Sequence, residues 1–130
     1  MANIALKKQT EYKKLPFQTI RIDGAGQQLG RLASKVAMIL MGKHKAGVSG
    51  HLDGHDSVVI FNAKQIKFSG KKIAQKVYKH HTNYPGGLRE YPLSKAWEKR
   101  PTWVIKEAIK QMLPKNTLRP NRLKHLTIEL

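Results

Sequence analysis

QLGRLASKVAMILMGKHK, residues 28–45, joins an apolar helical stripe to a cationic end. The apolar residues recur at the spacing of a helix that buries one face: Leu29, Leu32, Ala33, Val36, Ile39 and Leu40. Gly42 should end this helix, because a glycine just past the last turn readily takes the left-handed conformation. Lys43, His44 and Lys45 follow where the helix dipole favours positive charge.

Two strands are predicted around this helix. Residues 17–23 (FQTIRID) alternate well enough for a strand, and Gly24, Ala25 and Gly26 supply a tight turn before the helix. Residues 57–61 (SVVIF) form a continuous β-branched run, typical of a strand covered on both faces in a parallel sheet. This order of elements indicates an α/β fold.

The flanking segments predict the domain organisation. Residues 93–97 mark a short amphipathic helix, and Pro101 suits the first turn of a longer one. Residues 1–16 are polar and lysine-rich, with few side chains to bury. We therefore expect a basic N-terminal arm at 1–16 and a single α/β domain at 17–130.

Charge dominates the composition. The chain has 25 Lys and Arg against 8 Asp and Glu, a formal net charge of +17 on 130 residues. Such a field destabilises a folded chain by self-repulsion and suits a polyanionic partner, nucleic acid first and an acidic membrane second. A membrane partner is not expected, because no long apolar run exists. The absence of cysteine excludes disulfides and thiolate metal sites and fits a cytoplasmic protein.

The cations fall in two blocks that contain no acid. The first lies between Asp56 and Glu90 and the second between Ala108 and Ile128. A solvated face normally mixes charges, so unmixed blocks favour contacts with phosphate. Rings that can stack on unpaired bases interleave with the first block: Tyr78, His80, His81 and Tyr84.

Catalytic and cofactor chemistry is not indicated. Gly24, Gly26 and Gly30 approach the dinucleotide fingerprint, but their spacing is one residue too long and the ribose-binding acid is missing. HLDGHD, residues 51–56, has atoms that suit a metal ion, yet no clear further ligand occurs elsewhere, so no metal site is predicted. We expect no enzyme, no cofactor and no small-molecule substrate.

Four blocks resemble one family, in its order and spacing. They are LGRLASKVA with GKHKA (29–46), DSVVIFNAKQIKFSGKK (56–72), KVYKHHTNYPGGL (76–88) and IKQMLPKNTL (109–118). Over residues 19–126 the chain resembles the ribosomal large-subunit protein thirteen family. The resemblance implies a three-layer α/β/α fold around a mostly parallel four-stranded sheet. It also implies a structural, non-catalytic protein of the cytoplasmic ribosome that binds large-subunit rRNA, joins the subunit early in assembly and contacts neighbouring ribosomal proteins, without forming a homo-oligomer.

The resemblance implies that residues at the family's motif positions contact RNA. The family's GR, GKHK, basic and KxYxHH motifs correspond to Arg31, Lys43, His44, Lys45, Lys71, Lys72, Tyr78, His80 and His81, and its MLPKN block places Lys115 near phosphate. Cations beside these motifs complete the predicted RNA-binding set: Lys35, Lys64, Lys76, Arg119 and Arg122.

Two departures from the family pattern stand out. The family usually reads H-x-D-x-G-D where this chain has HLDGHD, so His55 occupies the position of the usual glycine. After MLPKN the family continues into a longer tail, whereas here Arg119 and Pro120 intervene and the sequence stops at Leu130.

Two other functional classes remain to be distinguished from a ribosomal protein. A nucleic-acid binder acting outside the ribosome would ignore RNA tertiary structure, and a nucleotide-binding α/β enzyme would bind a nucleotide saturably.

Overall fold

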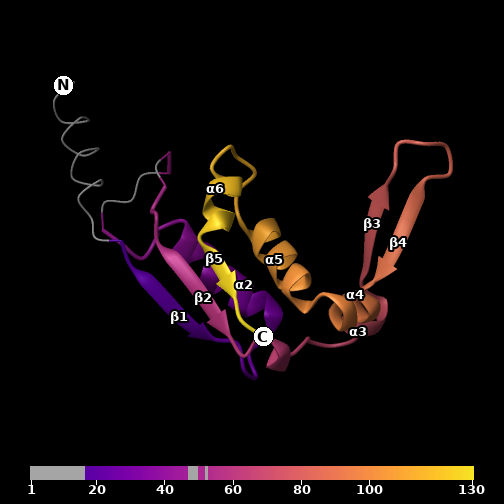
Figure 1. Ribbon diagram of the computed structural model, residues 1–130, viewed down its shortest axis with the longest axis horizontal. Coiled ribbons are helices and arrows are strands. Elements are labelled where there is room, and N and C mark those ends of the chain that lie inside the picture. Colours follow the sequence, from indigo (N-terminus) through magenta and orange to yellow (C-terminus); the bar gives the residue numbers. More distant parts are fainter. Residues whose placement is uncertain (1–16, 47–49, 52) are drawn as a thin grey trace.

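A computed structural model describes residues 17–46, 50–51 and 53–130 (Figure 1). The arm predicted at 1–16 lies outside the described residues. The elements are β1 (Thr19–Asp23), α2 (Leu29–Leu40), β2 (Ser57–Phe61), η1 (Ala63–Gln65), α3 (Lys72–Gln75), β3 (Val77–His81), β4 (Leu88–Pro92), α4 (Leu93–Lys99), α5 (Pro101–Met112), α6 (Arg119–Lys124) and β5 (Leu126–Ile128). The chain is thus a mixed α/β protein, as its sequence predicts. No helix in the described ranges has the length and apolar character needed to cross a membrane.

The main sheet has three parallel strands in the order β1-β2-β5, with Ile20 opposite Val58 and Val58 opposite Leu126. The resemblance implied four strands, but in the described part of the chain β3 and β4 form a separate antiparallel pair. One isolated parallel bridge joins Gln28 to Lys67. The four-stranded sheet is therefore not confirmed.

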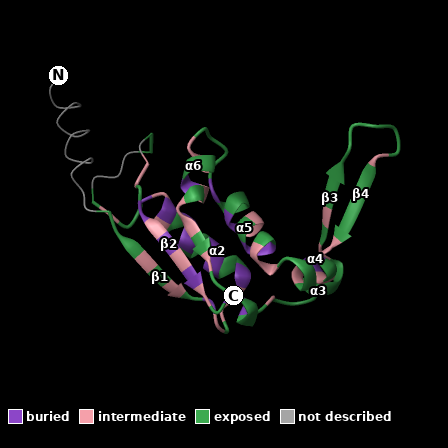
Figure 2. Cartoon of the chain, in the orientation of Figure 1, coloured by how far each residue is buried: buried purple, intermediate pink, exposed green. Residues whose placement is uncertain are grey.

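Helices α2 and α5 build the core against the sheet. Val58 and Ile60 of β2 are fully buried, whereas Val59 on the other face is only partly buried. Figure 2 shows the buried residues gathered where β2, α2 and α5 meet. The prediction that both faces of β2 are covered, and the third layer that the resemblance implied, are not confirmed by the described residues. Alternate residues of β2 are buried because one face of the strand receives the apolar stripe of α2.

Helix α2 ends as its sequence predicts. Gly42 has a φ of +75°, so it takes the left-handed conformation. Its N–H donates to the carbonyl of Ile39 at 2.8 Å, and the N–H of Lys43 donates to the carbonyl of Met38 at 3.0 Å. These two bonds form a Schellman cap, which turns the chain sharply at the end of α2. His44 and Lys45 are thereby directed back toward the sheet.

Asp56, immediately before β2, receives both of these side chains. It is 1% exposed. Its Oδ1 accepts hydrogen bonds from Lys45 Nζ at 2.6 Å and from the N–H of Gln18 at 3.1 Å, and its Oδ2 lies 3.3 Å from His44 Nε2. A buried carboxylate requires such partners, because removing one leaves a desolvated charge. Asp56 thus joins the end of α2 to the starts of β1 and β2.

Replacing Lys45 with Met should lower the free energy of unfolding by about 3 kcal/mol, because it removes the closest partner of a buried carboxylate. Lys43→Met is the matched control: it lies two residues away at the same helix end and is exposed. The control should change stability by no more than about 0.5 kcal/mol. Urea unfolding of both variants measures the difference, and equal midpoints would contradict this role for Lys45.

Candidate nucleic-acid interface

The β3–β4 hairpin projects from the end of the molecule formed by α3 and α4 (Figure 1). Its strands pair in the register His80 opposite Arg89 and Tyr78 opposite Tyr91. The base is held by the N–H of Leu93, which donates to the carbonyl of Lys76 at 2.8 Å. Tyr84, near the tip, is 77% exposed. The interleaved rings and cations predicted from the sequence therefore lie on a protruding arm.

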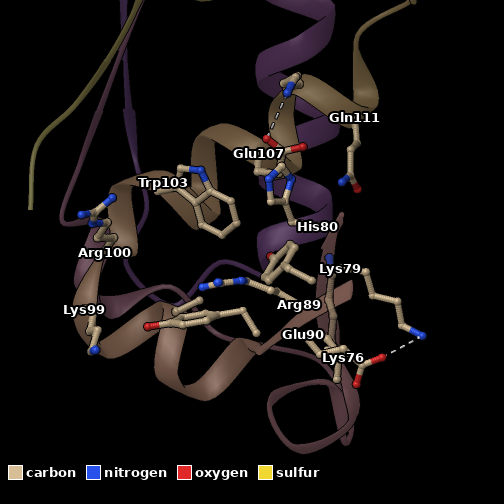
Figure 3. Close-up of a pocket in the computed structure, with 15 residues that line it drawn as sticks. Lys76, Lys79, His80, Arg89, Glu90, Lys99, Arg100, Trp103, Glu107 and Gln111 are labelled. Carbon is tan, nitrogen blue, oxygen red and sulfur yellow. Dashed lines mark hydrogen bonds and ion pairs between the residues drawn. The ribbon is translucent and has the colours of Figure 1, made fainter. Parts of the chain in front are cut away.

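A cleft of about 880 Å³ separates the hairpin from α4 and α5. Cations line it from both sides. Figure 3 shows Lys76, Lys79 and Arg89 on the hairpin segment and Lys99 and Arg100 at the end of α4. Lys110 of α5 also lines the cleft. Two of these are ion-paired at the surface, Lys79 with Glu90 at 3.1 Å and Lys110 with Glu107 at 3.3 Å. Exposed pairs contribute about 1 kcal/mol or less, so a phosphate can compete for these lysines. Within the described residues, Arg89, Lys99 and Arg100 have no acidic partner.

Aromatic rings form the inner wall of the cleft. The rings of Tyr78 and Trp103 meet edge to face, with centroids 4.9 Å apart, and Lys76 Nζ lies 5.1 Å from the centroid of the Tyr78 ring. Burial, reinforced by the negative charge of Glu107, raises the pKa of the Tyr78 hydroxyl above its usual value. Tyr78 therefore stays neutral at physiological pH. Trp103 remains 41% exposed and can receive a flat ligand group.

Two further hollows contain other residues of the predicted set. One, of about 910 Å³ beside α2 and α3, is lined by Arg31, Lys35, Lys72 and Lys76. The other, of about 550 Å³, is lined by Lys43, Lys115, Arg119 and Arg122. The structure places Lys64, Lys71 and His81 at exposed positions outside these hollows.

Several predicted contact residues have partners inside the protein. Lys45 and His44 hold Asp56, as described above. Arg119 donates to the carbonyls of Leu113 at 2.8 Å and Pro114 at 3.1 Å, which closes the turn after α5. Arg122 is 2% exposed and its Nε lies 3.6 Å from Asp53. These four side chains stabilise the fold, whatever else they contact.

The predicted set omitted five cations of the cleft, Lys79, Arg89, Lys99, Arg100 and Lys110, and the rings of Tyr91 and Trp103. Of these cations, Lys79, Arg89 and Lys110 belong to the two acid-free blocks. Lys99 and Arg100 follow Glu98 and so fall outside both acid-free blocks, although two cations directly before Pro101 were a readable signal. Trp103 lies on α5 beside the buried Val104 and Ile105, and sequence alone does not show which face it occupies.

The glycine turn before α2 has its backbone donors in use. The N–H of Gly24 donates to Phe61, that of Gly26 to Gln65 and that of Leu29 to Lys67, at 2.9 to 3.1 Å. A dinucleotide pyrophosphate needs such groups to point outward. Asp23 is similarly engaged: hydrogen bonds from the Ala25 N–H and the Asn62 side chain lower its pKa.

Comparison with known proteins gives one consistent family. The model for Ribosomal protein L13 matches residues 18–128. Over 107 residues the chain is 45% identical to the large ribosomal subunit protein uL13 of Clostridium kluyveri, covering 82% of this chain and 74% of that protein. The uL13 protein of Clostridium tetani is 47% identical with the same coverage, and that of Thermoanaerobacter sp. is 47% identical with 82% and 75% covered.

Tyr78→Phe should leave the protein as stable or up to about 1 kcal/mol more stable at pH 7, because the Tyr78 hydroxyl is buried without a hydrogen-bond partner among the described residues. The raised pKa of Tyr78 also predicts the direction in which stability changes at high pH. Above pH about 10 the unfolded chain releases this proton first, so the wild type should lose more stability than the variant. Thermal melts at pH 7 and pH 10.5 test both points. Tyr84→Phe, at an exposed position, is the control, and a Tyr78→Phe protein less stable than this control at pH 7 would contradict the assignment.

Proposed function

The chain belongs to the ribosomal protein L13 family, a non-enzymatic family of cytoplasmic ribosomes with a structural role in the large subunit, and we propose that it binds large-subunit rRNA and supports early assembly of that subunit. The observation that carries the proposal is the cleft between hairpin and helices, where cations surround the Tyr78–Trp103 pair. Ribosomal RNA and neighbouring ribosomal proteins are the partners. The like charge of a +17 chain opposes self-association.

Positioning on RNA would be electrostatic. Phosphates entering the cleft would meet Arg89 and Arg100 from opposite walls, while an unpaired base could stack on Trp103. Phosphate contacts carry no sequence information, so recognition would depend on an RNA shape that fits between the projecting hairpin and α5. We place Lys43 and Lys115 at a second contact, because both are exposed beside one hollow.

The arrangement of the basic surface supports a role in assembly. The three hollows lie against different elements, the hairpin, α2 and the segment after α5. A protein with cations on several faces can neutralise more than one RNA segment at once, which lowers the repulsion between those segments. Such a protein acts best while the RNA is still folding.

Replacing Arg89 and Arg100 with Gln tests the cleft. The double variant should weaken binding to transcribed large-subunit rRNA and reduce the slope of log K against log salt by roughly 1 to 2 units, because two phosphate contacts are lost. Filter binding across a salt series measures both quantities.

The matched control for this experiment is Lys95→Gln with Lys124→Gln. It removes the same charge from exposed positions that do not line the cleft. If the control loses as much affinity as the cleft variant, binding follows net charge and the cleft is not the site.

Family membership also predicts how the protein sediments. Tagged protein in a cell lysate should migrate with large subunits and should remain there after a high-salt wash, as an integral component does. Protein released by the wash, or found only in light fractions, would contradict the assembly role. The cleft variant should join fewer particles than the Lys95/Lys124 control.

A further inference from the structure

Two histidines and one carboxylate converge beside the start of β2. One ligand atom from each of Asp53, His55 and His125 lies within 4.8 Å of the other two. The rings of His55 and His125 meet edge to face, with centroids 6.0 Å apart. Asp53 and His55 belong to the HLDGHD loop, whereas His125 comes from the end of α6, 70 positions beyond His55. The further ligand that the sequence did not reveal is supplied by the fold.

The Asp53 carboxylate has an oxygen that accepts no hydrogen bond within the described part of the chain. Its side chain is 10% exposed, and its Oδ1 is buried with no hydrogen bond from any described residue. Arg122 Nε is 3.6 Å away, beyond hydrogen-bond distance. The ion pair with Arg122 offsets part of the cost of burying this charge, and the missing hydrogen bond leaves Oδ1 able to bind a metal ion.

His55 adopts a backbone conformation that favours glycine. Its φ is +52°, in the left-handed region. A side chain other than glycine is disfavoured there by about 1 kcal/mol. Strain of this kind persists where the surrounding structure or a bound group compensates for it.

The neighbouring backbone fixes the spacing of the three residues. The carbonyl of His125 accepts the N–H of Val58 at 2.9 Å, and the N–H of His125 donates to Arg122 at 3.2 Å. Asp56, next to His55, is anchored by Lys45 and Gln18. The HLDGHD loop and the residue His125 are thus both held by hydrogen bonds close to the cluster.

We propose that Asp53, His55 and His125 form a binding site for a borderline divalent cation, with Zn²⁺ the best match. Two imidazole nitrogens and one carboxylate oxygen are a common zinc ligand set, and water completes the tetrahedron. Ca²⁺ and Mg²⁺ prefer a shell of oxygen ligands, which this cluster does not offer. The guanidinium of Arg122 further disfavours cations held by charge alone, whereas Zn²⁺ gains from bonds to nitrogen. The ion would clip the HLDGHD loop to the junction of α6 and β5, independently of RNA.

Titration calorimetry of the purified full chain with ZnSO₄ is the first test. One ion should bind per chain, and MgCl₂ should give no heat of binding. At free Zn²⁺ one hundred times the Kd, the melting temperature should rise by roughly 5 to 15 °C.

Two variants and one control locate the ion. His125→Ala and His55→Gly should each weaken Zn²⁺ binding at least tenfold. His55→Gly should also melt at or above the wild-type temperature without Zn²⁺, since glycine relieves the strain, and below it with Zn²⁺. This reversal does not occur if His55 is only structural. His51→Ala removes the histidine nearest in the sequence to Asp53 and His55, and it should keep the wild-type affinity.

Three results would overturn the proposal. They are no saturable Zn²⁺ binding, binding unchanged in both His125→Ala and His55→Gly, or an equal loss in His51→Ala. RNA binding is measured separately on the same proteins. A failed Zn²⁺ titration with intact rRNA binding would reject the metal site alone.

Discussion

The buried carboxylate of Asp56 is the constraint on which the rest of the described structure depends. It joins the entry to β1, through Gln18, to the exit from α2, through Lys45 and His44, at the start of the central strand. The chain has only 8 acids, and placing Asp56 inside fixes where the side chains of Lys45 and His44 must point. The other cations then remain on the surface. The same charge imbalance that makes the protein a polyanion binder therefore makes its few acids structurally decisive, because each can hold cations that would otherwise repel one another.

The sequence predicts local elements well and their assembly less well. The helix α2, its glycine cap at Gly42, the strand β2 and the start of α5 at Pro101 depend on neighbours within a few positions, and these elements are confirmed. Ile39 of the predicted stripe is only partly buried. The sheet composition depends on pairing between distant segments. Residues 66–68 alternate as a strand would, yet they form only the single bridge at Lys67, because η1 redirects the chain after β2. Periodicity could not show this.

Side-chain roles at the candidate interface divide in the same way. The sequence shows that a cation is present but does not show where its side chain points. Lys45 and Arg122 therefore cannot be told apart from the exposed cations near them in the sequence, although their side chains are largely buried. Conversely, Lys99 and Arg100 become wall residues of the cleft only because α4 and α5 meet opposite the hairpin. His125 illustrates the limit most clearly, since its nearness to Asp53 and His55 arises entirely from the parallel pairing of β2 with β5.

The hairpin has a consequence for local unfolding. Its strands bury almost no side chains, as Figure 2 shows, and the buried cluster contains no residue of β3 or β4. A segment held mainly by ladder hydrogen bonds, one bond at its base and the contact of Tyr78 with Trp103 opens at a smaller free energy than the one that unfolds the core. Its amide hydrogens should therefore exchange with solvent well before those of β2. The hairpin has few packing contacts with the rest of the protein. A ligand that binds between it and the helices would therefore add contacts that stabilise its folded conformation.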